Sequence, residues 1–160
     1  MTGCTADAPL QAIESPNADS SAVAVERSDP SHLRFGQPYQ FANGLSVTVS
    51  EPRSFTPSEA AYPSAERAVS FGVWIRNESE RPYRLSGMSI AVAVNGEPAQ
   101  EIVDPAHGFN GIAGADTDVA TARDVMVTLA FAISLEADTV TLDLQPELTN
   151  PESAFYVGGI

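Results

Sequence analysis

The side chain with the clearest chemistry is the thiol of Cys4, the only cysteine in the chain. It directly follows Met1-Thr2-Gly3, so a small residue stands immediately before it. This arrangement is typical of the cleaved end of a bacterial lipoprotein signal, where the cysteine sulfur forms a thioether with diacylglycerol. We therefore expect Cys4 to anchor the protein to the outer face of the cell membrane. The alternative is an incidental free cysteine in a frayed terminus.

Histidine and methionine side chains raise the question of a metal site. Neither His32 nor His107 is spaced from other good ligands as a zinc site requires. Met88, His107 and Met126 carry donors that copper accepts. However, strand alternation places Met88 on an inward face, which favours core packing for it.

An Asp-x-Asp pattern, Asp116-Thr117-Asp118, lies in a segment that also contains Gly108, Gly111 and Gly114. Such a loop can chelate Ca²⁺, which takes six to eight oxygen ligands. The late Glu of the usual calcium loop is absent, so a solvated acidic loop is the better interpretation. We predict neither a metal site nor a cofactor.

Motifs for catalysis are missing as well. The chain has no Gly-x-Ser-x-Gly motif, and it contains no lysine, which excludes a Ser-x-x-Lys nucleophile. Glycine-rich phosphate loops of standard spacing are also absent. These observations predict that the protein is not an enzyme.

The charge balance restricts the partners. The net charge is −13, from 21 acidic and 8 basic residues. A strongly acidic surface repels phosphate backbones, so we expect no nucleic-acid partner. It also repels an anionic membrane, so only a chemical anchor would hold the protein there.

The fold class is predicted by strict alternation of apolar and polar residues. A period of two in several short segments is typical of half-buried antiparallel strands. The segments with this period are 45–49, 69–75, 88–94, 125–133 and 139–144. Asn43-Gly44 and Asn95-Gly96 suit hairpin turns, the second leading into a strand over 99–103. We predict an all-β, immunoglobulin-like antiparallel sandwich of about seven to nine strands.

Composition divides the chain into two parts. Residues 1–31 are dominated by Ala, Ser, Asp and Pro and hold too few large aliphatics to form a core. We therefore expect a disordered tether over 1–31 and a single sandwich domain over 32–160. A tether of that composition would hold the domain away from its anchor.

The order of several motifs resembles an actinobacterial lipoprotein family. In that family an early Asn-Gly turn precedes the first core strand, and a strand after a long loop ends in Asn-x-Ser. The matching segments here, spread over residues 33–145, are Phe35-Gly36, Asn43-Gly44 with the strand 45–49, and the strand from Val69 to Asn77-Glu78-Ser79 with Pro82 beyond it. The chain departs from the family at 120–123, where Ala-Thr-Ala-Arg replaces the usual Pro-Gly.

The resemblance implies a small secreted or lipid-anchored protein without assigned catalytic residues. It also implies an immunoglobulin-like sandwich similar to that of a mycobacterial immunoprotective extracellular antigen.

Trp74, the only tryptophan, is the residue most open to a binding role. By alternation it points away from Phe71, Val73 and the rest of the apolar face. With Gly72, Met126 and the alanines at 91, 93, 130 and 132, it could line a shallow partner surface. We favour a second placement, in which the loop 52–67 covers Trp74 with Phe55 and Tyr62. A bulge that turns Trp74 into the core is a third.

These observations predict a lipid-anchored extracytoplasmic module that binds a protein or another envelope partner. The alternative is a small-ligand or metal-binding accessory protein of an envelope transporter or cell-wall process. That alternative requires a pocket near Trp74 or near the loop 104–118.

Overall fold

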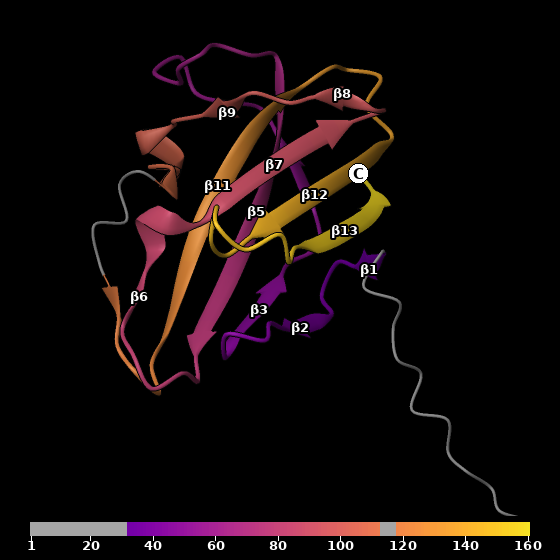
Figure 1. Cartoon of the computed structure of the whole chain (residues 1–160). Coiled ribbons are helices and arrows are strands. Elements are labelled where there is room, and N and C mark those ends of the chain that lie inside the picture. Colours follow the sequence, from indigo (N-terminus) through magenta and orange to yellow (C-terminus); the bar gives the residue numbers. More distant parts are fainter. Residues whose placement is uncertain (1–31, 113–117) are drawn as a thin grey trace, which may run out of the picture.

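The computed structural model describes residues 32–112 and 118–160, which form two β-sheets packed face to face (Figure 1). Cys4 and the whole predicted tether lie outside the described residues, as do Asp116 and Thr117. The anchor and the domain boundary at residue 31 therefore stay predictions.

The first sheet has the order β1-β13-β12-β7-β8. All its strand pairs are antiparallel except the parallel pair of β1 and β13. In Figure 1 its strands β7, β12 and β13 run diagonally in front of the second sheet. Its members are β1 (Leu33–Arg34), β7 (Ser89–Val94), β8 (Glu97–Pro98), β12 (Thr139–Gln145) and β13 (Ala154–Gly159).

The second sheet has the order β2-β3-β5-β11-β9 and is antiparallel throughout. A further strand, β4, pairs with the part of β5 that β3 does not reach. A separate pair, β6 and β10, stands outside both sheets. The members are β2 (Pro38–Gln40), β3 (Leu45–Val49), β4 (Arg53–Phe55), β5 (Arg67–Asn77), β9 (Glu101–Ile102), β11 (Asp124–Ile133), β6 (Tyr83–Arg84) and β10 (Asp118–Val119).

The predicted all-β sandwich is confirmed. Thirteen strands run through the described residues, more than the seven to nine expected, because seven of them have only two or three residues. The helical elements that lie wholly within these residues are two short 3₁₀ turns, η1 (Leu85–Gly87) and η2 (Pro105–His107). Within the same residues, no helix reaches the length and hydropathy that crossing a bilayer requires.

Strand alternation builds the core, because successive side chains of a strand point to opposite sides of its sheet. Along β5, Val69, Phe71, Val73 and Ile75 are at most 1% exposed. They pack in one cluster with the inward residues of β3, β7, β11, β12 and β13. Met88 belongs to that cluster, as its parity predicted.

The turn at Asn95-Gly96 forms as predicted, but its second strand does not extend over 99–103. Asn95 and Gly96 have φ values of 49° and 85°, which suits a turn with two positive φ angles. The partner of β7 is the two-residue strand β8, which ends at Pro98. The chain then crosses to the other sheet, where β9 pairs with β11. A proline cannot donate to the ladder, so pairing with β7 ends there.

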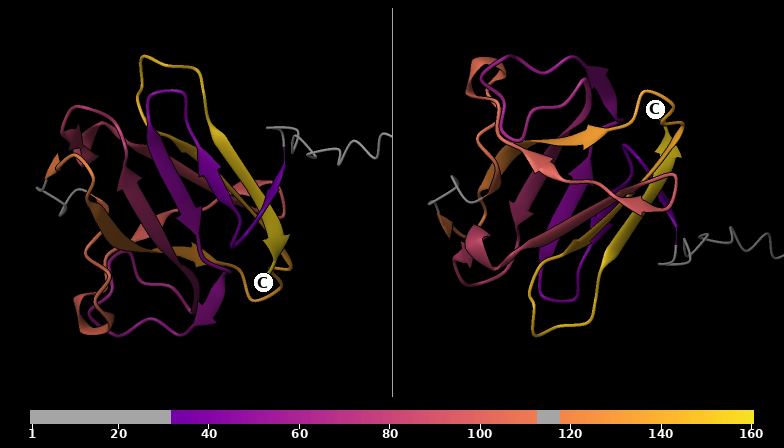
Figure 2. Two further views of the ribbon diagram at one scale, coloured as in Figure 1. Left: turned by 90° about the horizontal axis from the view of Figure 1, so that it is seen from below. Right: turned by 90° about the horizontal axis from the view of Figure 1, so that it is seen from above.

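The turn at Asn43-Gly44 joins β2 to β3 as predicted, with φ of 87° at Gly44. It lies beside the loop between β12 and β13 (Figure 2), where the Ala42 amide donates to a Glu152 carboxylate oxygen at 3.1 Å. This contact joins the β2–β3 turn of the second sheet to the β12–β13 loop of the first.

Asn77, at the end of β5, is fully buried and fully hydrogen-bonded. Its Nδ2 donates to the carbonyl oxygens of Arg81 at 2.7 Å and Val119 at 2.8 Å. Its Oδ1 accepts from the amide and the hydroxyl of Ser79, at 3.0 and 2.6 Å. The Asn-x-Ser motif therefore secures the loop after β5 against the segment before β11.

Candidate functional site

Trp74 lies on the outer face of the second sheet and is 45% exposed. Its neighbours across the strands are Thr48 in β3 and Met126 in β11. Met126 is itself 52% exposed. Burial of Trp74 under the loop 52–67, the placement we favoured, is therefore wrong, and so is the shifted register. The structure has the exposed placement, with Trp74 and Met126 side by side.

The loop does cover the outer face, but at the other end of β5. Its strand β4 pairs Arg53 with Ser70 and Phe55 with Ala68, six residues before Trp74. Phe55 and Phe109 pack there over a small second core of Ala68, Ile102 and Ala130. Tyr62, expected to help bury Trp74, is 80% exposed. One half of the outer face is thus covered and the half around Trp74 is open.

Gly72 determines how Trp74 lies. A Cβ built on Gly72 would stand 3.2 Å from both Cη2 and Cζ3 of the Trp74 ring. The six-membered ring therefore rests over Gly72, and its exposed area faces away from the sheet. Any larger residue at position 72 would push the ring outward.

A groove of about 370 Å³ runs along the border between the covered and the open half. Its size falls within the range of about 300–1,000 Å³ that small-molecule sites occupy. Its lining combines the Trp74 and Met126 side chains with an aromatic and polar wall. The lining residues are Ser50, Arg53, Ser70, Phe71, Gly72, Trp74, His107, Phe109, Met126 and Thr128.

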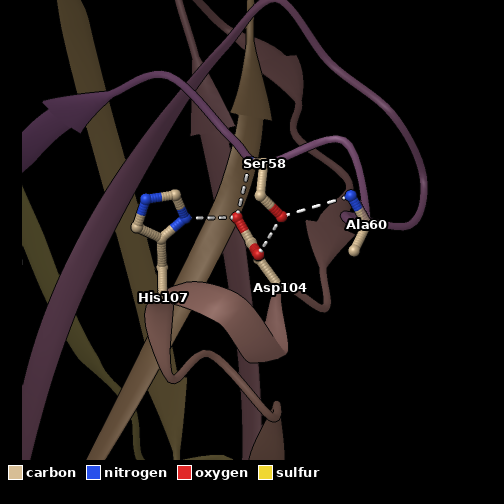
Figure 3. Close-up of polar contacts among 4 residues, drawn as sticks. All are labelled: Ser58, Ala60, Asp104 and His107. Carbon is tan, nitrogen blue, oxygen red and sulfur yellow. Dashed lines mark hydrogen bonds and ion pairs between the residues drawn. The ribbon is translucent and has the colours of Figure 1, made fainter.

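The His107 wall of the groove is supported by a buried carboxylate (Figure 3). Asp104, which is 0% exposed, accepts hydrogen bonds from Ser58 Oγ at 2.6 Å and the Ser58 amide at 2.9 Å. His107 Nδ1 lies 2.7 Å from the same carboxylate. Burial alone would raise the pKa of Asp104, but the hydrogen bonds from Ser58 and His107 hold that pKa well below its ordinary value.

This arrangement orients the imidazole. An ionised carboxylate only accepts hydrogen bonds, so Nδ1 of His107 carries the hydrogen. In the neutral ring, Nε2 is then left as an acceptor. Ser58 donates its hydroxyl hydrogen to Asp104 and not to His107. The three residues therefore fix the position of His107 and do not form a base that activates a serine nucleophile.

Arg53 supplies the one permanent charge in the groove lining. Within residues 32–112 and 118–160, its guanidinium makes no hydrogen bond and no ion pair, and no carboxylate lines the groove. The hydroxyls of Ser70 and Thr128 donate to the backbone oxygens of Arg53 and Gly108. Each hydroxyl oxygen thereby keeps its acceptor capacity.

The structure places the other candidate ligand residues from the sequence in different parts of the molecule. Met88 is buried, whereas Met126 and His107 line the same groove. Asp118 lies 3.8 Å from Arg84 in an ion pair, and His32 packs edge-on against Phe155. Among the described residues, no three or more His, Cys, Asp or Glu side chains gather as a metal site would require.

None of the four alanines considered near Trp74 lines the groove. Ala91 and Ala93 lie in β7 of the opposite sheet, while Ala130 and Ala132 lie under Phe55 and Phe109. Sequence reasoning missed Arg53 and Asp104. The i,i+3 spacing of Asp104 and His107 around Pro105 was the available signal, since a proline at the start of a turn favours a single helical turn.

No family model matches the chain, and no curated protein matches it in sequence. Solved structures do match in fold. YcdA of Bacillus subtilis, a candidate lipoprotein, has a TM-score of 0.60 at 12% identity, over 79% of this chain and 39% of YcdA. The chain thus spans about two-fifths of YcdA.

Two other structures match over nearly their whole length. MPT63, a secreted protein of Mycobacterium tuberculosis, has a TM-score of 0.53 at 10% identity and is covered to 99%, with 83% of this chain. A β-sandwich protein of Clostridium difficile has a TM-score of 0.51 at 16% identity, over 81% of this chain and 93% of its own. At such identities the likeness shows the sandwich fold, and membership of the actinobacterial family stays a prediction.

Proposed function

We propose that this protein is a lipid-anchored extracytoplasmic binding module that recognises its partner in the envelope through the Trp74 groove. The observation that carries the proposal is the pair of Trp74 and Met126, each about half exposed beside a groove. Tryptophan is enriched among the residues that contribute most to binding energy, because it buries a large rigid surface. An exposed pair of this size, set against an aromatic wall, is expected to be covered in the bound state.

The role that we propose is binding and not catalysis. The Ser58 hydroxyl and amide both donate to the Asp104 carboxylate, so His107 does not accept the hydroxyl hydrogen of Ser58. The location outside the cell rests on the Cys4 pattern and on the fold, which a secreted protein and a candidate lipoprotein share.

Binding can be tested by cosedimentation with an insoluble envelope fraction from a native host. Trp74→Ala should lower the apparent affinity by at least about tenfold, as expected for an anchoring tryptophan. Leu148→Ala is the matched control, because Leu148 is 76% exposed and lies outside the groove. Circular dichroism verifies that both variants fold. Equal cosedimentation of the wild type and Trp74→Ala would refute the role of the groove.

The anchor is tested separately by mass spectrometry of the full-length precursor made in the same host. We expect a diacylglycerol-modified Cys4 at the mature N-terminus and none in Cys4→Ser. An unmodified N-terminus would overturn the anchored half of the proposal.

A further inference from the structure

We infer that the Trp74 groove binds a sugar ring that carries a carboxylate. This inference rests on the proposed binding role and names the ligand class of the same groove. Three features of the lining support it. They are the orientation of the Trp74 indole, the charge of Arg53, and the hydrogen bonds that the Ser70 and Thr128 hydroxyls already make.

The indole provides a platform. Because Gly72 has no side chain, the ring of Trp74 rests close over the strand, and Trp74 is one of the residues that line the groove. The π face of an aromatic ring carries partial negative charge and attracts the slightly positive C–H bonds of a pyranose. Phe109 and Met126 add apolar surface to the same lining.

Arg53 determines the sign of the ligand. The protein as a whole carries a net charge of −13, yet the groove is lined by an arginine and by no acidic side chain in the described residues. A guanidinium without a protein partner matches a carboxylate in geometry and can donate two parallel hydrogen bonds to it. The net negative charge disfavours anions over the surface as a whole, so the Arg53 guanidinium is the feature that would favour an anion at this groove.

The side-chain hydroxyls of the groove can accept hydrogen bonds from the O–H groups of the sugar. Ser70 and Thr128 donate to backbone carbonyl oxygens, which leaves their lone pairs to accept from the ligand. His107 Nδ1 lies 2.7 Å from the Asp104 carboxylate, so in the neutral ring Nε2 is an acceptor as well. Several acceptors around one cationic donor suit a molecule rich in O–H groups with one carboxylate.

Because Trp74 is the only tryptophan, its emission reports on the groove without any label. We would titrate the protein with N-acetylmuramic acid and with N-acetylglucosamine, which share the pyranose ring and differ in the lactyl carboxylate. The acidic sugar should shift the emission of Trp74 and saturate at millimolar concentration. The neutral sugar should bind about tenfold more weakly, because it lacks the carboxylate that can accept charge-assisted hydrogen bonds from Arg53.

Arg53→Gln should weaken binding of the acidic sugar about tenfold and remove the preference between the two sugars. Arg81→Gln makes the same change of charge outside the groove and should leave both titrations unchanged. Glucuronic acid against glucose forms a second matched pair without the lactyl group. A response to glucuronate alone assigns the ligand to uronates, and a response to N-acetylmuramic acid alone assigns it to cell-wall sugars.

Equal binding of the acidic and neutral members of both pairs would overturn the inference, and so would an unchanged affinity in Arg53→Gln. Failure of every sugar to alter the emission would also overturn it. The proposed function would survive that failure if cosedimentation still depended on Trp74, so the two proposals can fail separately.

Discussion

Three side chains with identifiable chemistry, Trp74, His107 and Arg53, meet at one groove although they are far apart in sequence. Trp74 reaches it by strand alternation, and His107 by the hydrogen bond to Asp104. Arg53 reaches it through the pairing of β4 with β5. The position of each side chain therefore depends on a different interaction. Each side chain can be removed by a substitution that leaves the other two interactions in place.

The buried carboxylate of Asp104 should make the stability of the protein depend on pH. Its pKa in the folded protein lies below the ordinary value of 3.8, so the unfolded chain takes up the proton first as the pH falls. Its stabilising effect is therefore present above about pH 4 and is lost as the pH falls further. We expect Asp104→Asn to lower the free energy of unfolding at pH 7, and the difference from the wild type to shrink below pH 4.

Denaturant unfolding at a series of pH values measures this effect. Ser58→Ala removes one donor to the carboxylate and should raise the pKa of Asp104 in the folded protein, so the loss still begins near about pH 4 but is smaller and is complete at a higher pH. Asp138→Asn, at an exposed position, serves as the control for the charge change. A difference between the wild type and Asp104→Asn that stays constant from pH 7 to pH 3 would contradict the assignment.

At the scale of elements, the turn at Asn43-Gly44 is held by more than its own backbone. Gly44 has φ of 87°, and a Cβ there would stand 3.1 Å from the Cα, Cβ and N atoms of Ser79. Ser79 in turn is bonded to the buried Asn77. The first hairpin and the end of β5 therefore stabilise each other.

Gly36 provides a matched comparison, since its φ is 86° and nothing lies within 4 Å of its Cβ position. Gly36→Ala should lower the free energy of unfolding by about 1–2 kcal/mol from the left-handed backbone alone. Gly44→Ala should cost about 1–3 kcal/mol more, because it also crowds Ser79. Urea denaturation of both variants measures the difference. Equal losses would show that the contact with Ser79 contributes nothing.

At the scale of the whole molecule, the described residues form one continuous core between two sheets. The cluster contains residues from Leu33 to Tyr156, so the strands at both ends of the described chain are part of it. The sandwich does not depend on a disulfide, since Cys4 is the only cysteine.

The predicted boundary at residue 31 can be tested with trypsin, which cleaves after Lys and Arg. Arg27 is the only such residue in 1–31, so brief digestion should cut there first. The fragment that remains should unfold with a free energy within about 0.5 kcal/mol of the full chain, as for changes outside a packed core. Mass spectrometry identifies the cut, and chemical denaturation compares the two proteins. A markedly less stable fragment would mean that 1–31 contributes to the fold.

Much of this architecture follows from the sequence alone. Alternation in β3, β5, β7, β11 and β12 determines which side chains face the core, because the period of a strand is two whatever its partner. The Asn-Gly turns are favoured by the local φ angles of their glycines, and both formed. The outward direction of Trp74 was predicted in the same way.

Only the tertiary structure decided whether Trp74 is covered. The exposure of Trp74 depends on which part of β5 the loop 52–67 packs against. Its strand β4 pairs with β5 at Ala68–Ser70, so the loop does not cover Trp74. It also decided that Arg53 and His107 share a groove, since no local periodicity relates residues 53, 74, 107 and 126. Local geometry determines the direction of a side chain, whereas its neighbours depend on pairings between distant segments, which the pattern of one segment does not contain.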